Sequence, residues 1–263
     1  MDEIINKLTP NEDEEKRAEK VREWKKRILD GYSMGKKIPI KYSYRDDSTP
    51  SVQEGVNKKY TKEVFEDCLK RICEGQPNYY GQTDLYLYEA LSKYPIKGQD
   101  VCVIGSAHPW YETTCLHYGA RSVTVIEYSK RKSFHEKITY LHPDEELGVK
   151  FDFCFSISSF EHDGLGRYGD PINPNGDLEA MQKTKDILKP QGIMFLAVPV
   201  GKDTVWYNVH RVYGKHRFYK LIEGWKTLDE YGFDARSFDD TTNDGNCTPY
   251  QPLIILENSD ANV

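Results

Sequence analysis

The sequence lacks the features that mark several large classes of protein. No apolar run approaches the ~20 residues that a membrane-spanning helix needs, and residues 1–8 carry no cationic, apolar export signal. A net charge of −6 at pH 7 gives the chain no overall basic character for contacts with nucleic acid phosphates. These absences predict a cytoplasmic protein with no membrane and no nucleic acid among its partners.

Cysteine is present, but not in the patterns that bind metal or form a disulfide framework. The six cysteines include no CxxC pair, and their spacing is irregular. Cys102 and Cys154 lie inside apolar runs, where a thiol behaves as a small hydrophobic side chain. We therefore predict neither structural zinc nor disulfides.

Apolar runs alternate with helical patterns through the middle of the chain. Strands are expected at residues 100–105, 122–127, 137–141, 151–158 and 193–199, with helices at 111–118 and 178–188. Further on, a helix at 218–232 and strands at 235–239 and 252–257 would close the sheet. Strands that alternate with helices predict a Rossmann-like, doubly wound, mostly parallel α/β sheet.

The first 98 residues have a different pattern. Thr9 and Pro10 resemble a helix start, and a charged helix over residues 12–29 is expected to follow. Residues 31–57 are rich in turn formers and show no clear core element, whereas 60–74 and 85–94 read as amphipathic helices. We expect two parts: an N-terminal helical extension or lid at 1–98 and a Rossmann-like domain at 99–263.

A glycine and an acid mark the expected ligand end of this sheet. Gly105 ends the first strand, and Glu127 ends the second strand 22 residues later. A carboxylate at that place can accept hydrogen bonds from both ribose hydroxyls of an adenosine. The loop from Gly105 lacks the G-x-G-x-x-G glycines, which argues against NAD or FAD; the small residues Ser106 and Ala107 would suffice for a methionine-type tail.

The run of strands and the turn Leu188-Lys189-Pro190-Gln191-Gly192 resemble the ordered motifs of class I S-adenosylmethionine-dependent methyltransferases. The resemblance covers roughly residues 100–200. It implies S-adenosylmethionine as cofactor, with the glycine loop around methionine, the acid on ribose and the end of the fourth strand under the sulfonium. The residues implied at the cofactor are Gly105, Ser106, Ala107, Glu127, Tyr128, Ser158, Ser159 and Phe160.

Two polar loops follow the fourth and fifth strands and should face each other across one sheet edge. The first begins at Glu161 with EHDGLGRYGDPINP, and the second, from Asn208, reads NVHRVYG. Both motifs resemble a methyltransferase-like family catalogued as a domain of unknown function. That resemblance carries a hint of glycan or polar-metabolite modification.

Methyl transfer to a hydroxyl needs a base, and imidazole is the usual choice. His162 and His210 are the candidates, with Glu161 or Asp163 to orient the first. His162 could equally be a scaffold residue that caps its loop, and His210 a hydrogen-bonded loop histidine.

Charged side chains in the same loops could bind an acceptor. Arg167 and Arg211 could clamp a carboxylate or phosphate, although pairing with Asp170 or Asp203 is an alternative for either. The predicted substrate-binding residues are Arg167, Tyr168, Asp170, Arg211 and Tyr213. Glu161, His162, Asp163 and Asp170 could ligate Mg²⁺, but no spacing demands it, and no metal is predicted.

Three functions follow from these observations. The first is a methyltransferase for a small polar acceptor, with O-methylation of a sugar or sugar-derived metabolite as the specific expectation. Its substrate would be a sugar or a phosphorylated or carboxylated metabolite, and a homodimer is compatible with it. The second is a non-catalytic, methyltransferase-like binding module associated with glycan processing. The third is a nicotinamide-dependent enzyme of nucleotide sugars, which the missing glycines disfavour.

Overall fold

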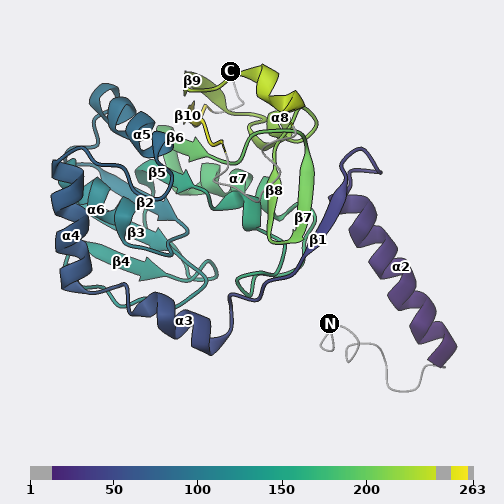
Figure 1. Cartoon of the computed structure of the whole chain (residues 1–263). Coiled ribbons are helices and arrows are strands. Elements are labelled where there is room, and N and C mark those ends of the chain that lie inside the picture. The colour runs from purple at the N-terminus through teal and green to yellow at the C-terminus, as the bar shows by residue number, and fades with distance from the viewer. Residues whose placement is uncertain (1–13, 241–249, 260–263) are drawn as a thin grey trace.

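The computed structural model describes residues 14–240 and 250–259, built around a seven-stranded sheet (Figure 1). The strand order is β4-β3-β2-β5-β6-β10-β9. Neighbours from β4 to β6 are parallel, whereas β10 is antiparallel to β6 and β9. In that order the strands span Ile138–Leu141, Ser122–Ile126, Asp100–Ile104, Phe151–Ile157, Leu188–Ala197, Leu253–Glu257 and Lys226–Tyr231. The predicted Rossmann-like, mostly parallel sheet is confirmed.

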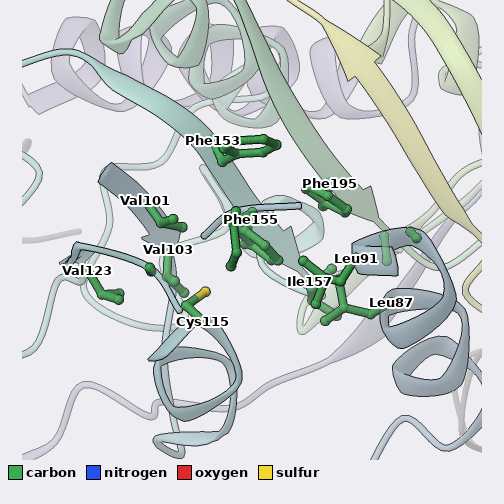
Figure 2. Packing of buried hydrophobic residues seen from close by; sticks show 14 of the residues in the cluster. Leu87, Leu91, Val101, Val103, Cys115, Val123, Phe153, Phe155, Ile157 and Phe195 are labelled. Atoms are coloured by element: carbon green, nitrogen blue, oxygen red, sulfur yellow. The ribbon is translucent and has the colours of Figure 1, made fainter. Parts of the chain in front are cut away.

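Successive side chains of the central strands enter two different cores, as the period of two in a strand requires. Val103 and Phe155 face α5 (Gln82–Lys93) and α6 (Trp110–His117), and Figure 2 shows this core with Leu87 and Leu91 from α5. On the other face, Cys154 packs with residues of α7 (Gly176–Ile187) and α8 (Phe218–Leu221). Both faces are covered, so the strands read as continuous apolar runs.

The N-terminal region contributes to the body as well as extending from it. Helix α2 (Glu14–Tyr32) points away from the sheet, while β1 (Ile40–Ser43) lies beside β7 (Thr204–Asn208) (Figure 1). With β8 (His210–Val212) these strands form a second sheet of order β1-β7-β8. The helix start expected at Thr9 lies outside the described residues, and the boundary at residue 98 stays a prediction.

Helices α3 (Pro50–Asn57) and α4 (Lys62–Cys73) complete this region. Thr61 caps α4 by accepting a hydrogen bond from the Val64 amide at 3.3 Å. The expectation that residues 31–57 contain no core element was wrong, because Ile38 is buried and β1 pairs with β7.

Two other predicted elements were wrong. The expected helix at 218–232 ends after one turn at Leu221, and β9 follows. The expected strand at 235–239 is a 3-10 helix, η2 (Ala235–Asp239). In the first case β9 pairs with β10, so that sheet pairing outweighs the helical period. In the second, the Asp234 side chain accepts a hydrogen bond from the Arg236 amide and begins the 3-10 helix. The residues expected to turn before the fifth strand lie within β6, where Gln191 adopts φ 62°.

A buried ionic cluster joins α7, β8 and the segment before α8. Asp177, which is 0% exposed, accepts hydrogen bonds from Arg217 Nε at 2.8 Å and Tyr213 Oη at 3.0 Å, and Arg211 Nε lies 3.7 Å away. Burial alone would raise the pKa of Asp177, but the two guanidiniums hold that pKa below its usual value. We call Asp177, Arg211, Arg217 and Tyr213 the ionic cluster.

Replacing Asp177 with asparagine should destabilise the fold strongly. The change leaves two buried guanidiniums without a carboxylate, which typically costs about 3–5 kcal/mol. Urea unfolding followed by circular dichroism would measure it. The matched control is Asp234→Asn, since Asp234 pairs with the exposed Arg236, and its unfolding midpoint should stay at the wild-type value. Equal midpoints for both variants would show that the cluster does not stabilise the fold.

Candidate functional site

The ends of β2 and β3 place Gly105 and Glu127 side by side. Glu127 Oε2 accepts a hydrogen bond from the Ser106 amide at 2.8 Å, and its Oε1 accepts one from the Ser129 amide at 3.0 Å. Gly105 has φ 75°, and a Cβ there would lie 2.9 Å from the Cβ of Ser159 at the end of β5. Glycine is therefore required where the β2 and β5 loops meet.

Two residues that the sequence pattern did not single out, Tyr60 and Glu112, contact the loop that begins at Gly105. Tyr60, just before α4, donates to the Ser106 carbonyl at 2.7 Å, and the Ser106 hydroxyl donates to Glu112 of α6. Burial raises the pKa of Glu112 to about 7. Ser106 is only 7% exposed, so its side chain braces the loop, whereas Ala107 is exposed.

These residues fit the nucleoside part of S-adenosylmethionine. A carboxylate has about four acceptor positions, so Glu127 keeps capacity for ribose hydroxyls beyond its two amide bonds. Tyr128 follows Glu127, and its ring stands edge-on to His142 with the ring centres 5.6 Å apart. The Ser106 amide already donates to Glu127, which leaves that amide unavailable to the methionine carboxylate in this arrangement.

The first polar loop begins with η1 (Phe160–His162) immediately after β5 and contacts the second loop directly. His162 Nδ1 lies 2.6 Å from the carbonyl oxygen of Val209. A carbonyl only accepts, so Nδ1 carries the proton and Nε2 has the free lone pair. Burial, with a smaller contribution from Arg167, lowers the pKa of His162 to about 3.

Glu161 lies against the lone-pair side of His162, with Oε1 3.7 Å from Nε2. Ser158 donates to Glu161, and Gln251 Nε2 in turn donates to the Ser158 hydroxyl at 3.1 Å. Burial raises the pKa of Glu161 to about 7, and its Oε2 is buried without a hydrogen-bond partner in the described structure. An acid poised near neutral pH and a neutral imidazole thus lie beside each other.

His210 and Tyr168 complete the polar group around His162. The ring centres of His162 and Tyr168 are 5.3 Å apart, and those of His162 and His210 are 6.4 Å apart. Arg167 lies over the Tyr168 ring and donates to Asp47 Oδ2 at 2.6 Å. Its charge is therefore paired, although the expected partners were Asp170 or Asp203.

Five predicted site residues make structural contacts within the protein. Arg211 and Tyr213 are 0% exposed members of the ionic cluster, so neither can meet an acceptor, and Phe160 is a 0% exposed core side chain. Asp170 accepts hydrogen bonds from the amides of Gly166 and Tyr168, which shapes the loop. Burial raises the pKa of Asp163, whose carbonyl accepts from Arg211 Nη1 at 2.6 Å.

Sequence reasoning missed the residues that reach the site from a distance. Tyr60 and Asp47 belong to segments that no local motif connects with the loops, and Gln251 precedes the last strand. Glu112 alone gave a usable signal, as an acid within the buried face of α6. Within the described residues, no group of three or more histidine, cysteine, aspartate or glutamate side chains is arranged to hold a metal ion.

The strand order, with one antiparallel strand between β6 and β9, is the class I methyltransferase fold, and the loops at its carboxyl edge are where that fold binds ligands. Residues 98–246, more than half of the chain, match the family described as Caenorhabditis protein of unknown function, DUF268. The chain belongs to this family. Among curated proteins, no sequence matches it. None of the described helices has both the length and the apolar character needed to cross a bilayer.

Several solved methyltransferase structures are similar at low identity. The N-methyltransferase NodS of Bradyrhizobium japonicum WM9 is 14% identical, with a TM-score of 0.45 over 68% of this chain and 95% of that one. An S-adenosylmethionine-dependent methyltransferase of Clostridium acetobutylicum is 10% identical, with a TM-score of 0.46 over 74% and 98%. One from Mesorhizobium loti is 14% identical, with a TM-score of 0.42 over 65% and 96%.

Replacing Gly105 with alanine should destabilise the chain more than the same change at Gly98. Both glycines have φ 75°, but a Cβ at Gly98 meets nothing within 4 Å, whereas one at Gly105 meets Ser159. The difference between the two variants isolates the contact, and overpacking of this kind costs about 1–3 kcal/mol. Urea unfolding measures it, and equal loss in the two variants would contradict the close approach.

Proposed function

We propose that the protein is an S-adenosylmethionine-dependent methyltransferase that methylates a hydroxyl of a small polar acceptor, a sugar or sugar-derived metabolite. One observation carries the proposal: the loop after β5 presents His162 with Nδ1 donating to the Val209 carbonyl and Nε2 bearing the lone pair. Hydroxyl methylation needs a proton acceptor of this kind within reach of the acceptor oxygen.

The cofactor, when bound, supplies an electrophilic methyl group on a positively charged sulfur. Glu127 would hold its ribose hydroxyls, and Gly105 and Ser159 would border the reacting end, since their loops converge there. Nε2 of His162 would accept the proton of the acceptor hydroxyl as that oxygen takes up the methyl group. The other chain groups need only orient the acceptor and exclude water.

Glu161 is suited to assist this proton transfer. Burial and the Arg167 charge lower the pKa of His162 to about 3, so the imidazole is neutral at physiological pH but is a weak proton acceptor without help from a neighbouring carboxylate. Once His162 is protonated, an ionised Glu161 carboxylate 3.7 Å from Nε2 would stabilise the imidazolium. The pKa of Glu161 is about 7, so near neutral pH a substantial fraction of the carboxyl is ionised.

A hydroxyl-rich acceptor is favoured by what surrounds His162. Tyr168 stands edge-on to the imidazole, and His210 lies on another side with Nε2 buried and without a partner in the described structure. Aromatic rings with polar tips suit the mixed apolar and hydroxyl faces of a sugar. Unpartnered buried polar atoms at such a place are groups that a polar ligand can satisfy.

Replacing His162 with alanine should lower methyl transfer about 10²–10⁴-fold, the usual contribution of a positioned proton acceptor. Cofactor affinity should stay within about twofold, a free-energy change well under 1 kcal/mol, because Glu127 and Gly105 are untouched. The assay follows label from S-adenosylmethionine into a panel of sugars and sugar phosphates, and calorimetry follows cofactor binding.

His117→Ala is the matched control, because His117 is an exposed histidine on α6. Its turnover should equal that of the wild type. Full activity in His162→Ala would remove His162 from the reaction. Cofactor binding without transfer to any acceptor in the wild type would instead favour a non-catalytic binding module.

A further inference from the structure

Residues 45–47 of the N-terminal region are fastened to both polar loops by two reciprocal pairs of hydrogen bonds. The Arg45 amide donates to Asn208 Oδ1 at 2.8 Å, and Asn208 Nδ2 donates to the Arg45 carbonyl at 2.9 Å. Two residues on, the Asp47 amide donates to the Arg167 carbonyl at 2.9 Å while Arg167 Nε donates to the Asp47 carboxylate at 2.6 Å. Asn208 is 3% exposed, so the first pair is well shielded from water.

These hydrogen bonds fix the backbone of Arg45 but do not involve its side chain. Arg45 is exposed, and its guanidinium makes no hydrogen bond or ion pair with any residue in the described ranges 14–240 and 250–259. The neighbouring Asp46 carboxylate accepts from the Ser48 amide and hydroxyl, at 3.1 Å and 2.6 Å, and Asp47 is paired with Arg167. Contacts therefore leave the charge of Arg45 unbalanced.

The backbone of Arg45 is held close to His210, because Asn208, to which Arg45 is bonded, is two residues before His210. Burial lowers the pKa of His210 to about 4, and the charges of Arg167 and Arg45 add to that shift. His210 Nε2 is buried and has no partner in the described structure. The His210 ring is next to His162, whose ring centre is 6.4 Å away.

We propose that Arg45 and His210 form a binding site for an oxyanion, a carboxylate or phosphate carried by the acceptor. A guanidinium binds the two oxygens of such a group with parallel hydrogen bonds, and a neutral imidazole can donate a third from Nε2. This inference rests on the proposed function in naming the acceptor class. The proposal assigns anion binding to Arg45 and His210 and no longer to Arg167 and Arg211, which are paired with Asp47 and Asp177.

The test uses the full chain without cofactor, labelled with ¹⁵N in its histidines. Inorganic phosphate and acetate are titrated separately while the ring resonances are followed, and the His210 signals are identified by their loss in His210→Gln. We expect a saturable shift of the His210 signals with one or both anions. The anion that binds more tightly identifies phosphate or carboxylate as the preferred group.

Arg45→Gln should weaken that binding at least about fivefold, or about 1 kcal/mol by the relation between affinity and free energy. Arg45→Lys should be intermediate, because it keeps the charge and loses the planar fork. Arg236→Gln, which changes an exposed arginine bonded to Asp234, should bind like the wild type. Unfolding midpoints check that each variant is folded.

Two results would overturn the proposal: an Arg45→Gln titration that matches the wild type, or no saturable shift with either anion. Neither depends on methyl transfer, because no cofactor is present. A chain that binds the anion yet transfers no methyl group would keep this site and refute the proposed function. A chain that methylates only neutral acceptors, and whose activity Arg45→Gln leaves unchanged, would keep the proposed function and refute this site.

Discussion

The contact of Asp177 with two buried arginines holds together the two polar loops at the carboxyl edge of the sheet. Arg217 and Arg211 neutralise Asp177 on one side, and each also donates to a carbonyl of the first polar loop. Arg217 Nη2 donates to the Pro174 carbonyl at 2.6 Å, and Arg211 Nη1 donates to that of Asp163. The two ends of the first polar loop are thus tied to the same buried charges, and the position of His162 follows from that connection.

Around this cluster, the site is assembled from three separate parts of the chain. The sheet provides Glu127 and Gly105 at the ends of parallel strands, the two polar loops provide the histidines, and the N-terminal region provides Tyr60, Arg45 and Asp47. The two histidines have lowered pKa values and Glu161 has a raised one, mainly because partial or full burial disfavours the charged form of each. Burial therefore keeps both imidazoles neutral near pH 7 and leaves Glu161 as the group of the three that titrates there.

The periodicity of the sequence predicted the central strands well, because buried parallel strands leave short apolar runs bounded by glycine and polar residues. It failed after residue 221, where pairing with β10 decided the structure, and at 235–239, which form a 3-10 helix. The convergence of Gly105 with Glu127 and of the two polar loops followed from topology alone. The contacts of Arg45 with Asn208 and of Tyr60 with Ser106 join residues 163 and 46 positions apart, and no local pattern encodes them. The sequence also suggested Arg211 and Tyr213 as acceptor contacts. Only the fold shows that both are buried against Asp177.

The central claim is that the carboxyl edge of this sheet binds a nucleoside cofactor through Glu127. Calorimetric titration of S-adenosylhomocysteine into the wild type and into Glu127→Gln tests it most directly, with Glu136→Gln, an exposed acid in the segment after β3, as the matched control. The account predicts one saturable site in the wild type and the control, with affinity at least about tenfold lower in Glu127→Gln, or about 1.4 kcal/mol. No binding to the wild type, or equal affinity in all three proteins, would contradict it.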